Sequence, residues 1–561
     1  MKRLLLLLAV LGIAWYLALP PRAPAPPAVP AGMTTPVRGA IHVHTRLSDG
    51  SGTPDTIAAA AARAGLRFVV LTDHGDGVRR PAAPRYHDGV LLIDALEIST
   101  EHGHVVALGM PQAPYPLGGE GRDVVDDIAR LGGFSIAAHP TSAKEDLRWT
   151  DDAASIGGLE WLNADSEWRD EPALRLMQAL FAYPGRPAEA VVALLDRPQE
   201  ALQLWDRLAR ERQVVGLAAL DAHARLGMDN VGEPYESRAV LPVPSYDAMF
   251  RAFSISLPDL TLTRDAAVDA AAVVRAIAAG RVYSTIDAVG GPAALSFSAQ
   301  SGQHRAVMGG VLPLDGPVAL NVATHAPANA RIVLLRDGRE VAAASGATLE
   351  HTADASPASY RVEVHLPGAP GDPQVPWIVT NPIYVGLVPP PPSVPAPRTT
   401  TAVQYEAGPP TGWSVETGAR SQGAIDELAQ IEGSQLGFRY AISGTASQFP
   451  YAAMVMQAGQ IAGYDRLVFT ARAARPMRLS VQLRAPSAAS PLGERWRRSV
   501  VLDSEPREIT VMFDDMRPVG AATPATPPLE RVTAVLFVVD TVNAELGSSG
   551  TFDIDDVRYA R

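Results

Sequence analysis

The first half of the chain alternates short, uniformly apolar runs with longer segments of helical pattern. This alternation extends from about residue 39 to residue 290. An uninterrupted apolar run is typical of a strand buried on both faces, as the strands of a parallel sheet are. Strands that alternate with helices predict β/α units, arranged as a barrel or as a doubly wound sheet. The apolar runs are RFVVLT (67–72), LLIDALEI (91–98), FSIAA (134–138), GLEWL (158–162) and VVGLAAL (214–220).

Three segments between these runs carry helix signals. Thr53 can cap a helix that begins at Pro54 and stops at Gly65, because threonine favours the N-cap and proline the first helical position. Residues 121–133, GRDVVDDIARLGG, repeat this pattern of an amphipathic run that ends in glycine. Residues 171–213 are charged and periodically apolar, which predicts a helical insertion.

The pattern changes beyond about residue 290. Short segments in which apolar and polar residues alternate, such as VALNVAT and YRVEVHL, are separated by turn residues, which predicts a β-sandwich over residues 291–388. The proline-rich residues 389–398 predict a stiff linker. A second β-rich block, residues 399–561, follows and ends in GTFDIDDVRYA.

The N-terminus carries a basic and then apolar segment. Lys2 and Arg3 precede an apolar run, residues 4–19, which is followed by a proline-rich spacer over residues 20–37. Sixteen residues rise about 24 Å as a helix, slightly less than a hydrocarbon core of roughly 30 Å. We therefore expect residues 1–19 to be a signal peptide or a membrane anchor. The protein would then be exported to the periplasm or another extracytoplasmic space, either released there or anchored to the inner membrane by this segment.

Composition narrows the classes of function. A formal net charge of -12 argues against a surface that coats nucleic acid, since such surfaces are usually basic. The chain has no cysteine, which excludes thiolate metal sites, disulfides and cysteine nucleophiles.

Histidines and carboxylates gather at the ends of the predicted strands. Eight of the twelve histidines lie between residues 42 and 223, and seven of those are at or beside strand ends. Ligand sites of α/β folds form at the carboxyl ends of parallel strands. Imidazoles and carboxylates in these positions, without cysteine, predict a metal site of nitrogen and oxygen ligands, which suits zinc, manganese or iron.

The order of these motifs resembles that of the PHP (polymerase and histidinol phosphatase) superfamily. The resemblance covers roughly residues 38–290 and rests on HVHTRLSDG, TDHGDG, the region of Glu97, AHP and DAH. It implies an α/β fold, a distorted (β/α)7 barrel, that holds two or three divalent metal ions.

The resemblance also implies a role for each strand-end residue. One metal would be held by His42, His44, Glu97 and Asp221, a second by Glu97, His104 and His139, and a third by Asp49, His74 and His223. A metal-bound hydroxide, held by Glu97, Asp221 and His139, would be the nucleophile. Asp73, on the other side of its strand from His74, would be structural.

Four arginines lie just past these strand ends: Arg79, Arg80, Arg85 and Arg225. They are either ordinary surface residues or cations that grip an anionic substrate. We single out Arg79, Arg80 and Arg225 as candidates for substrate binding.

Two further resemblances leave the substrate open. A barrel followed by a β-sandwich that ends in PWIVTNPIYV is similar to the CehA/McbA-type metallohydrolases, which implies either a phosphoester or a carboxyl or carbamate ester as substrate. The last block resembles a galactose-binding-type β jelly roll, which either binds a glycan or is only structural. Phosphoester hydrolysis is the leading hypothesis, and the alternatives are ester hydrolysis on the same metals and glycan binding with an inert barrel.

Overall fold

The computed structural model describes residues 10, 12–23, 29, 33–152, 154–225, 241–388, 396–418, 420–429, 434–488, 493–520, 522 and 524–561. Most of the predicted leader, much of the proline-rich spacer and most of the predicted linker therefore lie outside the described residues. Within the described residues, no helix combines the length and the apolar character needed to cross a bilayer. The chain forms two compact units, one of residues 1–111 and 120–391 and the other of residues 112–119 and 392–561.

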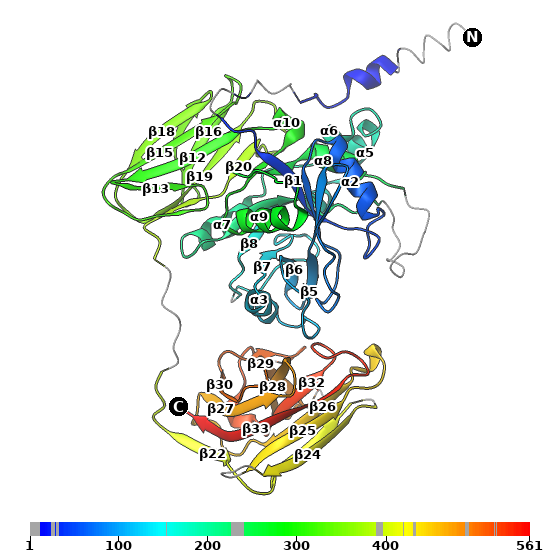
Figure 1. Ribbon diagram of the computed structural model, residues 1–561, viewed down its shortest axis with the longest axis vertical. Helices are drawn as coiled ribbons and strands as arrows, with labels where there is room; N and C mark the ends of the chain where they lie inside the picture. Colours follow the sequence, from blue (N-terminus) through cyan, green and yellow to red (C-terminus); the bar gives the residue numbers. More distant parts are fainter. Residues whose placement is uncertain are drawn as a thin grey trace, which may run out of the picture. The chain divides into compact units, whose positions relative to one another are not determined.

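The first unit is a mixed α/β structure (Figure 1). One sheet pairs β2 with β1 and β4 in parallel, whereas β3, β10 and β11 join it antiparallel. These strands are β1 (Val37–Val43), β2 (Phe68–Leu71), β3 (Arg85–His87), β4 (Val90–Asp94), β10 (Ser254–Leu257) and β11 (Tyr283–Thr285).

A second sheet in the same unit begins with an antiparallel hairpin. Its order is β5-β6-β7-β8-β9, in which β7, β8 and β9 are parallel. The strands are β5 (Leu96–Thr100), β6 (Gly103–Leu108), β7 (Phe134–Ala137), β8 (Gly158–Asn163) and β9 (Val215–Ala219). Two isolated parallel bridges, Val43 with Ala222 and His74 with Glu97, connect the two sheets. In the described residues the strands thus form two bridged sheets of mixed direction, which confirms the α/β class, and the distorted (β/α)7 barrel stays a prediction.

The predicted helices lie between these strands. Thr53 caps α2, its hydroxyl accepts the amide of Thr56, and Pro54 begins the helix, as the sequence predicts. The expected helix over residues 121–133 is α3, and the expected insertion forms α5, α6 and α7. The helices are α2 (Pro54–Arg63), α3 (Gly121–Arg130), α4 (Ala164–Arg169), α5 (Ala173–Ala182), α6 (Pro187–Val192), α7 (Gln199–Ala209), α8 (Tyr246–Ala252), α9 (Ala266–Ala278) and α10 (Asp287–Gly290).

A β-sandwich follows the α/β part and shares a sheet with it. Strand β20 pairs antiparallel with β11, so that the first α/β sheet continues into the sandwich as a 12-stranded sheet. The strands on this side are β14 (Val311–Leu312), β16 (Arg331–Arg336), β17 (Arg339–Ser345), β19 (Ala358–His365), β20 (Ile378–Thr380) and β21 (Ile383–Val385). The facing four-stranded sheet holds β12 (Leu295–Ser301), β13 (His304–Val307), β15 (Val318–Thr324) and β18 (Thr348–Ala353). Segments 38–290 and 291–388 are therefore continuous through one sheet.

The tail motif PWIVTNPIYV explains part of this continuity. Asn381 is 1% exposed, and its side chain accepts the amide of Gly216 and donates to the carbonyls of Gly216 and Val282. Strand β9 and the start of β11 are thereby tied to the sandwich by one amide side chain.

We expect Asn381→Ala to lower the free energy of unfolding by about 2 kcal/mol, because three buried backbone groups lose their partner. Urea denaturation of the two proteins measures the difference. The matched control is Asn321→Ala, which removes an exposed asparagine of β15 and should change stability by less than about 0.5 kcal/mol. An unchanged midpoint for Asn381→Ala would contradict this account of the motif.

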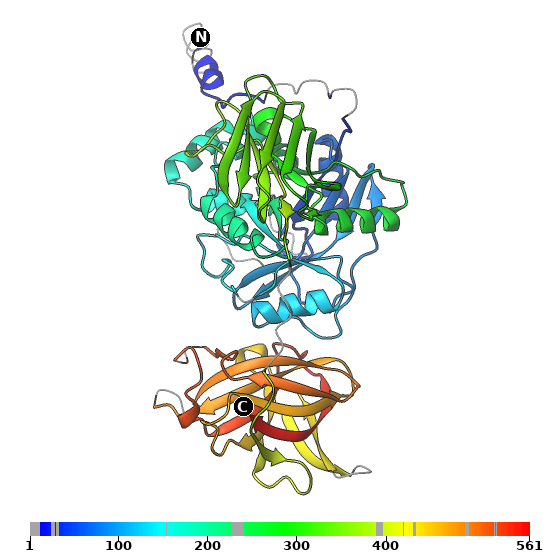
Figure 2. The same ribbon diagram turned by 90° about the vertical axis from the view of Figure 1, so that its left-hand side faces the viewer.

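The second unit is a sandwich of two six-stranded antiparallel sheets (Figure 2). Its core contains fully buried Phe438, Phe469, Trp496 and Phe537, drawn from both sheets. One sheet holds β22 (Thr401–Tyr405), β24 (Gln422–Ala429), β25 (Ser434–Ala441), β27 (Arg466–Ala473), β30 (Arg507–Met512) and β33 (Ser549–Ala560). The other holds β23 (Trp413–Thr417), β26 (Tyr451–Gln457), β28 (Met477–Ala485), β29 (Glu494–Leu502), β31 (Arg517–Pro518) and β32 (Ala534–Asp540).

Candidate metal centre

Four buried side chains bring their ligand atoms to one point in the first unit. The Nε2 atoms of His42 and His44 each lie 3.3 Å from Oε2 of Glu97. The same nitrogens lie 3.4 and 3.3 Å from Oδ1 of Asp221. Ligand atoms about 2.1 Å from a tetrahedral metal are about 3.4 Å apart, so these four atoms have the spacing of a metal coordination shell.

The same two histidine nitrogens have no hydrogen-bond partner among the described residues. Nε2 of His42 and Nε2 of His44 are buried, and no donor or acceptor in this part of the chain completes a hydrogen bond with either. Because a buried polar atom without a partner is costly, such atoms require an explanation in a native structure. A divalent cation between the four side chains would satisfy them, so the residues present fit a metal ion.

Glu97 lies between two groups of histidines. Its Oε2 faces His42, His44 and, at 3.2 Å, Nδ1 of His74. Its Oε1 lies 2.9 Å from Nδ1 of His104 and 2.9 Å from Nε2 of His139. A carboxylate whose two oxygens face separate imidazole groups can bridge two metal ions.

A third group lies at the more exposed side of the cluster. Nε2 of His223 is 3.1 Å from Oδ2 of Asp49, and the rings of His44 and His223 stack with centroids 4.2 Å apart. His74, 35% exposed, approaches the same Asp49 oxygen at 3.8 Å. Among the described residues, four groups have ligand atoms that all lie within 4.8 Å of one another. They are His44, Asp49, His74 and His223; His42, His139 and Asp221; His42, His44 and Glu97; and His74, Glu97 and His104.

All nine residues that the sequence nominates as ligands are thus brought together. His102 lies outside this cluster, where its Nδ1 accepts the amide of Gly121. His104, two residues later on β6, lies against Glu97 instead.

The approach of His42 and His44 does not come from the regular alternation of a strand. The register of β1 against β2 shifts between Ala40 and Val43, and His42 has a φ of 63°. A bulge therefore turns His42 toward His44, and their ring centroids are 5.2 Å apart. His139 and Asp221 also have positive φ, 31° and 47°. Such backbone strain, about 1–3 kcal/mol at each position, is typical of functional sites.

The two central carboxylates are charged. Burial alone would raise the pKa of Glu97, but the charge of His42 and the hydrogen bonds of His104 and His139 hold it well below its usual value. Burial likewise opposes the ionisation of Asp221, yet His42 and His44 hold the pKa of this carboxyl low. The same contacts raise the pKa of His44 to about 10 against the effect of its burial. Since an imidazole must be neutral to bind a metal, binding would release protons.

Glu160 contacts two of the candidate ligands, His42 and His139, and is missing from the predicted site. Its Oε1 lies 2.6 Å from Nδ1 of His42, and its Oε2 accepts the amide of His139 and the side chain of Asn163. When a carboxylate accepts the N–H of the ring nitrogen that does not bind the metal, it fixes the orientation of the histidine ring and raises the basicity of the ligating nitrogen. The signal available in the sequence was a single acid inside the apolar run GLEWL.

Asp73 and Tyr246 hold the loops that carry the ligands. The Asp73 carboxylate accepts from the amide and hydroxyl of Thr45 and from the hydroxyl of Ser48, which agrees with a structural role. The Tyr246 hydroxyl lies 2.8 Å from the carbonyl oxygen of His44 and 3.1 Å from that of His223. No pattern in the sequence indicated Tyr246.

We expect Glu160→Gln to lower metal affinity or turnover about 10–100-fold, because glutamine cannot supply the negative charge beside His42. Titration calorimetry with Mn²⁺ or Zn²⁺ measures the affinity. Glu200→Gln is the matched control, since its side chain is 73% exposed on α7. Wild-type affinity and turnover in Glu160→Gln would contradict this role.

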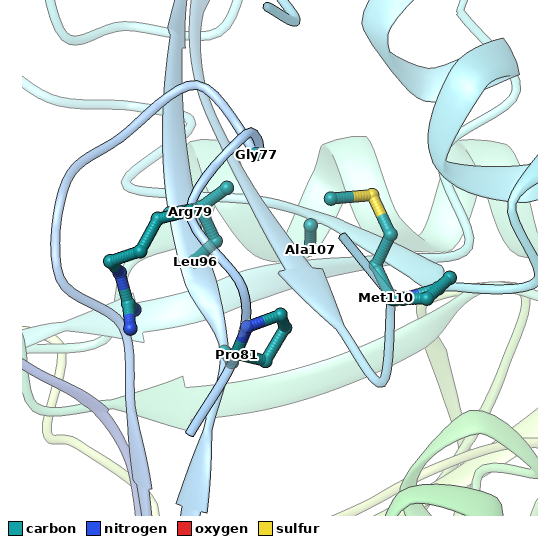
Figure 3. A pocket seen from close by; sticks show the side chains of 8 residues that line it. Gly77, Arg79, Pro81, Leu96, Ala107 and Met110 are labelled. Atoms are coloured by element: carbon teal, nitrogen blue, oxygen red, sulfur yellow. The ribbon is translucent and has the colours of Figure 1, made fainter. Parts of the chain in front are cut away.

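The arginines nominated for substrate binding differ in their surroundings. Arg79 forms a bidentate pair with Asp94, at 3.0 and 3.2 Å, and lines a small pocket together with Pro81, Leu96 and Met110 (Figure 3). Arg85 pairs with Asp55.

Within the described residues, neither Arg80 nor Arg225 forms an ion pair. Arg80 is exposed, and Arg225 is half-buried two residues after His223.

Arg169, at the end of α4, is a further cation of the first unit, and two of its nitrogens donate to Asp165. Burial opposes its charge, but the hydrogen bonds and charge of Asp165, together with the charge of Asp221, raise its pKa above the usual value. It lies in the segment WRDEP, which the sequence analysis does not single out.

Comparison with known proteins gives one relative by sequence. No protein-family model matches the chain. The chain is 27% identical over 161 residues to the 3',5'-nucleoside bisphosphate phosphatase of Chromobacterium violaceum, and the alignment covers 26% of this chain and 55% of that protein. The chain thus spans about half the length of the curated relative it matches, and it is similar over this part to a phosphatase.

Solved structures similar to part of the chain are β-sandwich modules. A family 11 carbohydrate-binding module of Clostridium thermocellum is 15% identical, with a TM-score of 0.24, and covers 28% of this chain and 94% of the module. A family 30 module of the same organism is 9% identical to this chain, with a TM-score of 0.22, and the match covers 29% of this chain and 97% of the module. At these scores the similarity says nothing about a ligand.

Proposed function

We propose that this protein is a metal-dependent phosphoesterase of the PHP type. The observation that carries the proposal is the set of four atoms, from His42, His44, Glu97 and Asp221, spaced as the coordination shell of a metal. The partial similarity to a phosphatase supports the same reaction class. The presence of Glu97 between two histidine groups supports a cluster of two or three ions, of zinc, manganese or iron.

Divalent ions held here would activate a water molecule at neutral pH and neutralise charge on the phosphoryl group. The residues of the chain would fix the geometry of that reaction. Glu97, Asp221 and His139 would hold the metal-activated water, and Glu160 holds His42 and the backbone of His139 in place. The burial of these side chains keeps bulk water away from the ligands, whereas half-exposed His74 and His223 mark the side from which substrate enters.

Arg225 is the cation that we assign to the anionic substrate. It is half-buried and lies two residues after His223. A guanidinium can bind a phosphoryl group through two parallel hydrogen bonds. Arg79 and Arg169 are weaker candidates, because Asp94 and Asp165 already bind two nitrogens of each guanidinium.

The test is a comparison of initial rates on matched substrates. Purified protein loaded with Mn²⁺ or Zn²⁺ is given p-nitrophenyl phosphate, a phosphate diester, a nucleoside 3',5'-bisphosphate and a p-nitrophenyl carboxyl ester. Phosphoester turnover that is lost in Asp221→Ala and kept in Asp88→Ala, an exposed carboxylate, supports the proposal.

Two results would reject phosphoester hydrolysis. Turnover of the carboxyl ester alone would keep the metal cluster and assign an ester or carbamate substrate. Absence of turnover in protein with full metal content would favour a binding role, which a glycan array probes.

A further inference from the structure

Helix α5 presents an apolar face to the outside of the first unit. Leu174, Met177, Leu180 and Phe181 are 63%, 60%, 54% and 61% exposed. The spacing of Leu174, Met177 and Phe181 places them on one side of the helix. An amphipathic helix of a soluble protein normally turns such a stripe toward its core. In α5, only Ala182 is buried.

The inner side of α5 is held by Arg175 and by small apolar contacts. Arg175 donates to the carbonyl of Ala193, 2.7 Å away, and pairs with Glu171 one turn earlier. Leu176 and Ala179 are half-buried on the same side. The larger apolar side chains of α5 therefore remain on the outside of the first unit.

A second apolar segment meets the end of this stripe. The indole of Trp15 donates to the carbonyl of Phe181, at 3.1 Å, and the two rings pack edge to face, 6.4 Å apart. Leu19 is buried against Ala182 and Ala190. The N-terminal apolar segment thus lies beside α5 within the first unit (Figure 1).

The described part of this segment is itself exposed. Residues 12–17 are helical, and Ile13, Tyr16 and Leu17 are 60%, 57% and 76% exposed. Arg186 lies over the ring of Tyr16, 5.5 Å from its centroid, and contacts the carbonyl of Pro20. Apolar, aromatic and basic side chains in one surface are the composition of helices that lie in a membrane interface.

We propose that the stripe of Leu174, Met177, Leu180 and Phe181 is a membrane-contacting surface that seats the first unit on a lipid bilayer. The continuity of the stripe with the N-terminal segment favours lipid over a second copy of the chain. A bilayer covers the stripe and the exposed Ile13, Tyr16 and Leu17 at once, whereas a protein partner would have to be shaped to cover both. This inference is independent of the proposed hydrolysis.

The absence of cysteine allows a direct test with the full chain. Met177→Cys and Leu180→Cys are each labelled with a fluorophore that reports polarity and added to vesicles of phosphatidylethanolamine and phosphatidylglycerol. Val268→Cys, on α9 and 52% exposed, is the matched control, and Ile13→Cys reports the N-terminal segment.

When vesicles are added, we expect the emission maximum of the labels at positions 177 and 180 to shift to shorter wavelength. Spin-labelled lipid should quench the fluorescence of these two labels, whereas the label at position 268 should show neither change. The proposal is overturned if the label at position 13 is quenched and those at 177 and 180 behave like the one at 268. It is equally overturned if the labels at 177 and 180 shift without vesicles and in proportion to protein concentration, which would indicate a second copy on the stripe.

Discussion

Glu97→Gln is expected to remove metal loading and to lower kcat/KM at least about a thousandfold, equivalent to about 4 kcal/mol of transition-state stabilisation. The carboxylate faces five histidines through its two oxygens, three on Oε2 and two on Oε1. Glutamine has almost the same shape but no negative charge, and its amide nitrogen cannot ligate. Both halves of the cluster should therefore lose their shared anion.

The measurements are metal content by mass spectrometry and initial rates on the phosphoester that the wild-type protein hydrolyses best. Asp88→Asn is the control, because this carboxylate is 57% exposed and is no member of the candidate metal groups. A circular dichroism spectrum like that of the wild type shows that the fold persists. A Glu97→Gln protein with full metal content and full rate would refute the bridging role.

The features that could be predicted from the sequence are those set by residues close together in the chain. Several of the nine nominated ligands lie at or beside the ends of apolar runs, the set as a whole came from the resemblance to the PHP superfamily, and the structure brings all nine side chains together. The helix after Thr53 was equally local, since its cap and its first proline are adjacent in the chain.

Features set by contacts between distant residues could not be predicted in this way. The antiparallel hairpin of β5 and β6 and the division into two sheets depend on which strands pair. Glu160 reaches His42 across 118 positions, and Tyr246 reaches His44 across 202. The merging of the α/β part and the sandwich likewise rests on the pairing of β11 with β20, which an apolar pattern cannot specify.

A buried charge network that no pattern revealed should carry the largest effect on stability. Arg361 of β19 is 2% exposed and makes hydrogen bonds of 2.7 and 2.9 Å to Asp206 of α7. It also lies 2.6 Å from Glu363, which Arg197 binds as well. The insertion helix α7 is thereby joined to the sandwich by a largely buried network of charges.

Arg361→Ala is expected to lower the free energy of unfolding by about 3–5 kcal/mol, because it leaves two buried carboxylates without their shared cation. Arg331→Ala, which breaks an exposed pair with Glu340 in the same sandwich, should cost less than about 1 kcal/mol. Urea denaturation of both variants measures the difference. Equal losses in the two variants would contradict a special role for the buried network.

The pH dependence of this loss supplies a second test. Burial alone would raise the pKa of Glu363, but the hydrogen bond of His365 and the charges of Arg361 and Arg197 hold it well below its ordinary value of 4.5. A carboxyl whose pKa is lowered by folding stabilises the protein fully above the unfolded pKa, and this contribution disappears as pH falls toward the folded pKa. The wild type should therefore lose stability below about pH 4.5, whereas Arg361→Ala, in which Glu363 keeps only Arg197 and His365, should lose less. The gap between the two proteins is expected to be widest at neutral pH and to narrow in acid, and a gap that stayed constant from pH 7 to pH 3 would show that the loss comes from packing against Trp205 rather than from charge.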